Sequence, residues 1–210
     1  MLQEASTLSI DLQYFPCVNW FKDSIAAGRF LFHPEVHFRR SSFSNRMLVP
    51  GSNGLINLSI PIVGGRGTSL AYKQVLIDYK SPWQRDHLRT IESVYGNSPF
   101  FFQYRDELQA LYGKKIDGLF NWNLTCLEWI SGKIGIVLPI ENIQSILTDD
   151  LVRLPIQDKY KPANFDEPVN GPFVKYPQVF EDRLGFKSNM SIIDLLFNTG
   201  PAITKQILFS

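Results

Sequence analysis

The chain has 210 residues, of which 44% are hydrophobic and 20% are charged. These proportions are typical of a folded globular protein and exclude a chain that is mainly disordered. Lysine and arginine number 21 against 20 for aspartate and glutamate, a formal charge of +1. A general nucleic-acid binder usually carries a larger basic excess, so we expect no nucleic-acid partner.

Targeting signals and cysteines indicate the compartment. The N-terminal region carries Glu4 and Asp11 and no basic run, so we expect no signal peptide. No apolar run is long enough to predict a transmembrane segment. Cys17 and Cys126 are far apart and have apolar neighbours, which favours buried, reduced thiols over a disulfide or a catalytic thiol. We therefore expect a cytoplasmic protein.

The first 80 residues show the alternation of polar and apolar side chains that is typical of strands. We expect strands over residues 7–12, 29–33, 45–49, 55–62 and 73–78, with a helix over 18–27. Two glycines within 50–54 predict a hairpin that joins the third and fourth strands. In the fourth strand every second residue from Ile56 to Ile62 is isoleucine or leucine, so we expect that face to be buried.

Helical patterns dominate after residue 80. Ser81, Pro82 and Gln84 form a start signal, with Ser81 as the cap, for a helix that ends before Gly96. Further helices are expected over 101–113, 116–132 and 176–184 and from residue 191 to a break at Gly200-Pro201, with a short strand over 135–139. The helix over 116–132 is apolar on every face. We therefore expect it to be the most buried helix, with Leu124 and Leu127 in the core.

Together these patterns predict an α/β fold with a single domain spanning residues 1–210. A mixed sheet, mainly from the N-terminal 80 residues, is expected to be packed by helices from the middle and C-terminal parts. Five prolines between residues 155 and 177 predict an extended surface segment. Residues 178–210 are expected to form a helical C-terminal clasp that folds back on the domain.

Several short segments occur together in a recognisable order. They are Tyr14-Phe-Pro16 with Trp20-Phe21, residues 38–46, Asn53-Gly54 with 58–61, the helical series Trp83, His87, Ile91 and Tyr95, residues 98–101, and residues 191–201. In this order they resemble the WbqC-like family of bacterial proteins over nearly the whole chain. The resemblance implies a role in O-antigen and lipopolysaccharide biosynthesis, with transfer of an amino-acyl or acyl group to a sugar precursor. The chain departs from many members at Asp11-Leu12, where they have Gln-Pro, and at Arg39-Arg40, where they have lysine.

A basic segment is the first candidate site. It contains Arg39, Arg40, Asn45 and Arg46, with three serines between them. Guanidinium groups bind carboxylate or phosphate bidentately, so this segment predicts a site for an anionic small molecule such as a sugar nucleotide or an acyl donor. The alternative is a solvated loop with surface salt bridges. Asn123, on the apolar side of its helix, is expected either to border that site or to satisfy polar groups of the core.

His87 is the candidate catalytic residue. It shares one helix face with Trp83 and Ile91, and imidazole titrates near neutral pH, which suits general acid–base catalysis. The alternative is a buried, hydrogen-bonded structural histidine. His33 and His37 are four residues apart, but the sequence places no third and fourth ligand beside them, so we expect no metal site.

Two further features are expected to be structural. The glycine-rich residues 64–67 lack the spacing of a phosphate-binding loop and predict a connector. Asp194 lies three residues after Ser191, so we expect it to cap the helix that begins there.

Two functions therefore remain open, and no particular cofactor is indicated. One is a transferase in which His87 moves protons and the arginines hold the anion. The other is a non-catalytic ligand-binding or partner-binding protein of the same pathway, which the absence of a recognisable catalytic motif favours. The transferase hypothesis expects His87 and the arginines to converge in one cleft, covered by residues 155–177.

Overall fold

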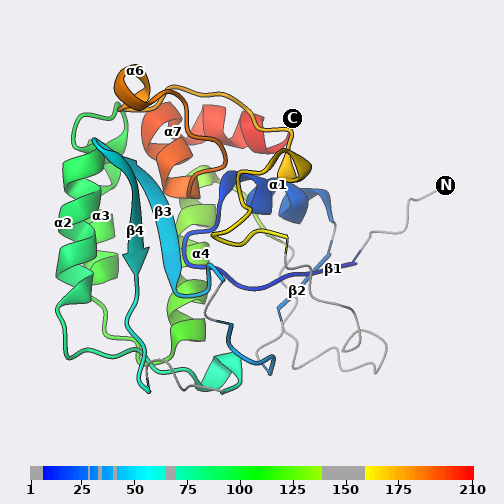
Figure 1. Ribbon diagram of the computed structural model, residues 1–210, viewed down its shortest axis with the longest axis vertical. Coiled ribbons are helices and arrows are strands. Elements are labelled where there is room, and N and C mark those ends of the chain that lie inside the picture. The colour runs from blue at the N-terminus through cyan, green and yellow to red at the C-terminus, as the bar shows by residue number, and fades with distance from the viewer. Residues whose placement is uncertain (1–6, 28, 33–34, 40–41, 65–69, 139–158) are drawn as a thin grey trace.

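The computed structural model describes residues 7–27, 29–32, 35–39, 42–64, 70–138 and 159–210 (Figure 1). Its elements in chain order are β1 (Thr7–Ser9), α1 (Val18–Ala26), β2 (Arg29–Leu31), β3 (Arg46–Gly51), β4 (Gly54–Ser59), the 3-10 turn η2 (Tyr72–Gln74), α2 (Trp83–Tyr95), α3 (Phe101–Tyr112), α4 (Leu119–Ile134), the 3-10 turn η4 (Pro168–Asn170), α6 (Glu181–Leu184) and α7 (Ile192–Leu208). The predicted α/β class, with strands early in the chain and helices after residue 80, is confirmed.

The strands form two separate pairs rather than one continuous sheet. β1 and β2 are parallel, and β3 and β4 form an antiparallel hairpin. The hairpin turn is tighter than the five-residue loop predicted from the sequence, because Gly51 pairs with Gly54 and leaves only Ser52 and Asn53 in the turn. Gly54 has a φ of 134°, a conformation that glycine adopts without strain.

The apolar face predicted for the fourth strand is buried in part, since Ile56 and Ile62 are half-buried. Leu58 and Ile60 are buried, whereas Asn57 and Ser59 are exposed. The hairpin therefore presents its apolar side to the helices, and in Figure 1 it runs alongside α2, whose residues contact β3.

Two predicted strands are absent from the described residues. The Gln74 side chain accepts a hydrogen bond from the Ala71 N–H at 3.2 Å, and this contact accompanies the turn η2 in place of the start of strand 73–78. Only single bridges follow, from Leu76 to Gly118 and from Ile77 to Ile62. Residues 136–138 are likewise irregular. An alternating pattern predicts a strand only when a partner backbone lies alongside, and the sequence does not reveal the partner.

The helix boundaries differ from prediction where tertiary contacts intervene. Gln84 donates to the carbonyl of Lys114 at 2.6 Å, so it does not complete a capping box with Ser81, and α2 begins one residue later than predicted. Residues 116–118 pair with the 75–79 segment, which delays the start of α4 to Leu119. Of the predicted helix 176–184, only Glu181–Leu184 forms.

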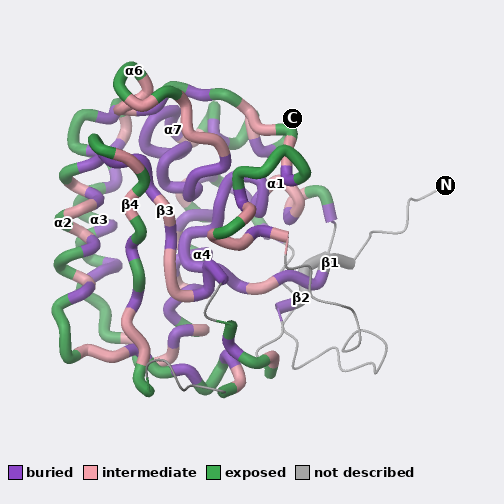
Figure 2. The backbone as a smooth tube through the Cα atoms, viewed as in Figure 1, coloured by how far each residue is buried: buried purple, intermediate pink, exposed green. Residues whose placement is uncertain are grey.

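The most buried helix is α7, and the prediction that assigned this place to residues 116–132 is wrong. Every residue of α7 from Ile192 to Gly200 is buried, while α4 keeps an exposed edge (Figure 2). α7 packs on both α1 and α4. Gly200 breaks its regular backbone at the predicted place, with a φ of 73°. A Cβ at Gly200 would lie 2.5 Å from the Phe100 ring. Because glycine has no side chain, the loop before α3 can approach α7 closely at this point.

Residues 159–178, hereafter the strap, run irregularly across α1 apart from the turn η4 (Figure 1). Several side chains of the strap are buried against the rest of the fold, among them Tyr160, Phe165 and Asn170. Phe165 packs with Phe43 and Met190 in a small cluster of its own. The predicted part of this segment from residue 155 to 158 lies outside the described residues.

The burial of α4 yields a stability prediction. Leu127 is 1% exposed in the main core, whereas Leu124 is only partly buried, contrary to the expectation that both lie in the core. We expect Leu127→Ala to lower the free energy of unfolding by about 2–5 kcal/mol and Leu124→Ala to lower it clearly less. Urea denaturation of both variants measures the difference. Equal losses, or a loss below about 1 kcal/mol for Leu127→Ala, would contradict this assignment.

Candidate functional site

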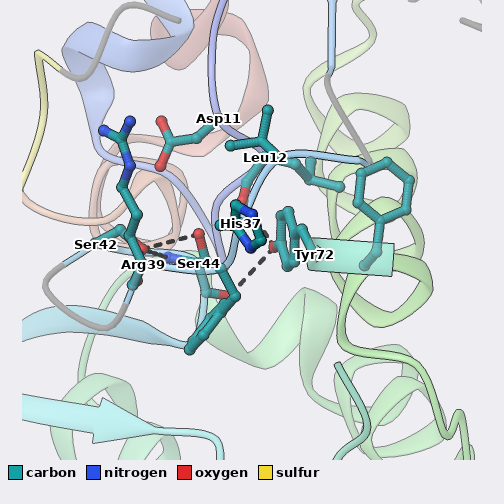
Figure 3. A pocket seen from close by; sticks show the side chains of 10 residues that line it. Asp11, Leu12, His37, Arg39, Ser42, Ser44 and Tyr72 are labelled. Carbon is teal, nitrogen blue, oxygen red and sulfur yellow. Dashed lines mark hydrogen bonds between the residues drawn. The ribbon is translucent and has the colours of Figure 1, made fainter. Parts of the chain in front are cut away.

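A small pocket lies between the segment that follows β1 and residues 36–44 (Figure 3). Its polar side is formed by Asp11, His37, Arg39, Ser42 and Ser44, and its apolar side by Leu12, Val36, Phe38, Tyr72 and Phe120. A mostly apolar pocket with a few convergent polar groups is the usual form of a small-ligand site. Arg39 is the predicted anion-binding residue that reaches it.

The size of this pocket limits what it can hold. About 30 Å³ is open to the centre of a water-sized sphere, two to three times the smallest space that holds one water molecule. The pocket therefore admits a small group such as a carboxylate or a phosphate. A larger ligand would have to extend outside it.

The floor of the pocket is fixed by buried polar contacts. The hydroxyl of Tyr72 donates to the carbonyl of Leu12 at 2.8 Å, and the Nδ2 of Asn123 donates to the carbonyl of Ser44 at 2.6 Å and to the Tyr72 hydroxyl. Burial raises the pKa of Tyr72 well above its usual value, so the phenol stays protonated. Asn123 thus supports the floor from α4 and does not itself line the pocket.

The two serines of the pocket are hydrogen-bonded to its backbone. The Ser42 hydroxyl donates to the carbonyl of Arg39 at 2.5 Å and accepts from the backbone N–H of Ser44 at 3.2 Å. Both serines are buried, whereas the Arg39 and His37 side chains are exposed. The two serines are therefore hydrogen-bonded within the fold, whereas the side chains of Arg39 and His37 are accessible to solvent.

His87 lies elsewhere, in a buried hydrogen-bonded chain. A carbonyl only accepts hydrogen bonds, so the His87 Nε2 carries the proton that it donates to the carbonyl of Ser59 at 3.2 Å. Nδ1 then accepts from the Tyr14 hydroxyl at 3.1 Å, and Tyr14 also shares a hydrogen bond with the Tyr112 hydroxyl. Burial lowers the pKa of His87 to about 4, so the imidazole is neutral at physiological pH.

His87 and Arg39, which were predicted to converge, line different pockets, whereas Arg46 pairs with Ser59, the residue whose carbonyl accepts the His87 hydrogen bond. His87 borders an open depression between β4 and α2, lined with Asn57, Leu58, Ser59, Pro61, Ser81, Trp83, Asp86 and Thr90. Arg39 lines the other pocket, and no described residue of the strap lines that pocket. The reason is that His87 contacts the hairpin at the Ser59 carbonyl, opposite Arg46, whereas Arg39 belongs to the segment before β3 and lines the other pocket.

The remaining predicted residues are distributed along the hairpin. Asn45 donates from Nδ2 to the carbonyl of Ile60 at 3.0 Å and prolongs the pairing of β3 with β4. Arg46 begins β3 opposite Ser59. Arg40 lies outside the described residues, as do His33 and most of the loop 64–67. Of the predicted binding residues, the structure thus brings Arg39 and Asn123 to one place.

Sequence reasoning missed Asp11, Tyr72 and Phe120 as pocket residues and considered His37 only as a metal ligand. Asp11 lies just before Tyr14-Phe-Pro16, and nothing in the sequence marked it as a pocket residue. Tyr72 and Phe120 carried no signal either, since both look like ordinary core residues. Among the described residues, no three of the His, Cys, Asp and Glu side chains gather as a metal site requires.

Both cysteines are buried and free, as predicted. Burial raises the pKa of Cys17 to about 12 and that of Cys126 well above its usual value. Both thiols are therefore protonated at neutral pH and are poor nucleophiles.

Asp194 does not cap its helix, which corrects the prediction from its spacing. The Ser191 hydroxyl donates to the carbonyl of Phe15 at 2.8 Å and accepts nothing from the first turn of α7, and the Ser191 N–H donates to the carbonyl of Leu48 at 3.3 Å rather than to Asp194. The Asp194 carboxylate accepts from the Tyr176 hydroxyl at 2.9 Å and from the Gln178 Nε2 at 2.7 Å. Burial raises its pKa to about 6. This carboxylate fastens the end of the strap to α7.

Comparison with known proteins shows which family the chain belongs to. The profile of the WbqC-like protein family matches residues 12–156, more than two thirds of the sequence. The chain belongs to the WbqC-like protein family. The matched region includes the pocket residues from Leu12 to Phe120 but ends before the strap, so the resemblance noted over residues 191–201 lies outside it. Searches of curated proteins and of solved structures returned no match. No described helix of this WbqC-like protein has the length and apolar character needed to cross a bilayer.

The neutral state of His87 predicts a pH dependence of stability. Its pKa is about 4 in the fold and about 6.5 when unfolded, so only the unfolded chain binds the proton between these values. Stability should therefore fall as the pH drops from 6.5 to 4, by up to about 3 kcal/mol from this group. The raised pKa of Asp194 acts in the opposite direction, because its contribution is lost as the pH rises toward 6.

The contribution of His87 is isolated by comparing the wild type with His87→Gln in urea at each pH. The Asp194 effect is common to both proteins and cancels. We expect the stability advantage of the wild type over the variant to shrink from pH 7 to pH 4. A constant difference across this range would show that His87 is not held neutral by the fold.

Proposed function

We propose that this WbqC-like protein binds a small anionic group of its ligand in the pocket at Arg39. The observation that carries the proposal is the convergence of an exposed guanidinium, an exposed imidazole and apolar walls on a backbone held by buried serines. Guanidinium binds carboxylate and phosphate with two parallel hydrogen bonds, and the pocket has room for either group.

The ligand class follows from the size of the pocket and from the family. The pocket takes only the charged end, so a sugar nucleotide or an acyl donor would place the rest of the molecule along the open side. Membership of the WbqC-like family supports a step in O-antigen or lipopolysaccharide biosynthesis, and we place the protein in the cytoplasm on the same grounds. The binding function is favoured over catalysis by His87, because both ring nitrogens of His87 are engaged in buried contacts away from Arg39.

Group transfer is the second candidate, and His37 is the observation that favours it. Its imidazole is exposed and lines the same pocket as Arg39. In such a step an acceptor amine attacks the carbonyl carbon of an acyl or amino-acyl donor, and the bond to the leaving group breaks. His37 would take the proton from the amine and return it to the leaving group.

A ligand screen tests the binding function. Thermal-shift measurements with sugar nucleotides, acyl-coenzyme A compounds and amino acids should reveal a stabilising ligand, since saturation at about 100 times Kd adds roughly 2.7 kcal/mol. Arg39→Ala should weaken its binding at least tenfold, because the charged hydrogen bonds to the anion are lost. Arg89→Ala, an exposed arginine of α2, is the matched control and should bind as the wild type does.

Equal binding by the Arg39→Ala and Arg89→Ala proteins would refute the anion site. For the transferase candidate, His37→Gln should lower turnover with little change in ligand affinity. Full turnover in that variant would leave binding as the function.

A further inference from the structure

Gln13 is a fully buried amide beside the pocket. Its Nε2 donates to both carboxylate oxygens of Asp11, at 3.1 and 3.3 Å, and to the carbonyl of Tyr160 in the strap at 3.1 Å. Turning the amide over would point its Oε1 at three other oxygens, so these acceptors fix its orientation. The Asp11 carboxylate is thereby held from behind by a side chain that cannot rotate.

The same amide also destabilises the fold, because one of its two polar atoms is buried without a hydrogen-bond partner among the described residues. Its Oε1 is buried and accepts no hydrogen bond in the described part of the chain. A buried acceptor without a partner costs on the order of 1–3 kcal/mol, and a leucine or methionine of similar volume would avoid that cost. What the amide provides in return is its Nε2, whose hydrogen bonds go to Asp11 and to the strap.

Asp11 in turn faces the anion-binding side of the pocket. Both Asp11 and Arg39 line it, and in Figure 3 the Arg39 side chain extends along the pocket toward the Asp11 carboxylate. Arginine has many rotamers, and ordering such a side chain on binding costs affinity. A carboxylate fixed beside the guanidinium reduces that cost by orienting its planar fork before the ligand arrives.

The strap supplies a rigid anchor for this arrangement. The Tyr160 hydroxyl donates to the Asp23 Oδ2 at 2.8 Å, and Lys159 Nζ contacts the same oxygen at 2.9 Å. Asp23 belongs to α1, so the carbonyl that receives the Gln13 hydrogen bond is tied to a helix. A continuous series of polar contacts thus runs from α1 through Tyr160 and Gln13 to Asp11.

We propose that Gln13 and Asp11 are positioning residues, which orient the Arg39 guanidinium for a bound anion, with Tyr160 of the strap as their anchor. This inference rests on the proposed function, because it assigns a purpose to the carboxylate beside the anion-binding arginine. It makes the strap, which lies beyond the residues matched by the family profile, a part of the site.

The test uses inorganic sulfate as the probe, because sulfate remains a dianion between pH 5 and 8. Sulfate is titrated at constant ionic strength, and the Arg39 Nε–Hε signal is followed by NMR. Gln13→Met keeps the volume and removes the donors, and should weaken sulfate binding about tenfold, the cost of ordering one arginine side chain. Arg39→Lys keeps the charge but not the fork, and should weaken it by a similar factor.

The combination of the two substitutions gives the readout that a merely structural role would not produce. If Gln13 acts through the guanidinium fork, the double variant should bind sulfate no more weakly than Arg39→Lys alone. Asn19→Leu is the matched control, since Asn19 also holds the strap, through the carbonyls of Asn170 and Pro172, but does not contact Asp11. It should bind sulfate as the wild type does.

A further variant covers the case in which Gln13→Met does not fold. Gln13→Glu places a carboxyl group against Asp11, so its sulfate affinity relative to the wild type should be low at pH 8 and recover toward pH 5, where a proton is shared. An unchanged ratio across this range would overturn the inference.

The remaining outcomes separate the two proposals. Wild-type affinity in Gln13→Met, losses that multiply in the double variant, or an equal loss in Asn19→Leu would each overturn the positioning role and leave the anion site standing. If sulfate does not shift the Arg39 signal and Arg39→Lys does not alter its affinity, the anion site itself is refuted, and the positioning role with it.

Discussion

Buried backbone carbonyls need hydrogen-bond donors, and the way in which this need is met determines how the segments of this protein are held together. Its strands are short, and long stretches between residues 35 and 80 and between 159 and 191 are irregular, so sheet partners supply few of the donors there. Side-chain amides supply several of them, in most cases across more than 20 residues of sequence. Gln13 donates to Tyr160, Asn19 to Asn170, Asn123 to Ser44, Asn189 to Phe165 and Gln178 to Lys187. Each of these bonds ties an irregular segment to another part of the chain, and most of these segments border the pocket or the strap.

Large aromatic side chains fill the core between the segments that these hydrogen bonds connect. Trp83, Tyr112 and Trp122 pack edge to face, and Tyr14 and His87 stack beside them. The hydroxyls of Tyr14 and Tyr112 and the ring nitrogens of His87 satisfy one another and the Ser59 carbonyl. A neutral histidine in such a place connects α2, α3, β4 and the N-terminal segment without burying a charge. Packing in the core therefore explains the helical series that contains Trp83 and His87.

The pocket at Arg39 combines rigid support with exposed charge. Its floor is held by buried hydrogen bonds from Tyr72 and Asn123, whereas the Arg39 side chain reaches solvent. Positioning polar groups on a fixed frame lowers the cost of binding, since little has to be ordered when the ligand arrives. The proposed anion site is compatible with a chain of nearly neutral charge, because a guanidinium binds an anion by directed hydrogen bonds that need no broad basic surface.

The sequence alone determined the features that depend on neighbouring residues. The α/β class, the hairpin over 46–59, the ends of α2 and α3 and the break at Gly200 follow from side-chain alternation, helical spacing and glycine conformation, all of which act within one or two turns of chain. It also singled out the segment of Arg39, which the structure places at a pocket. Tertiary structure decided the rest. It turned residues 72–74 into a 3-10 turn, made α7 the most buried helix and separated His87 from Arg39. It also brought Asp11, Tyr72 and Phe120 to one pocket. The reason is that a pocket is formed by side chains from distant segments. Which segments come together depends on the pairs that buried amides and carbonyls form across the core, and no local pattern of the chain encodes these pairs.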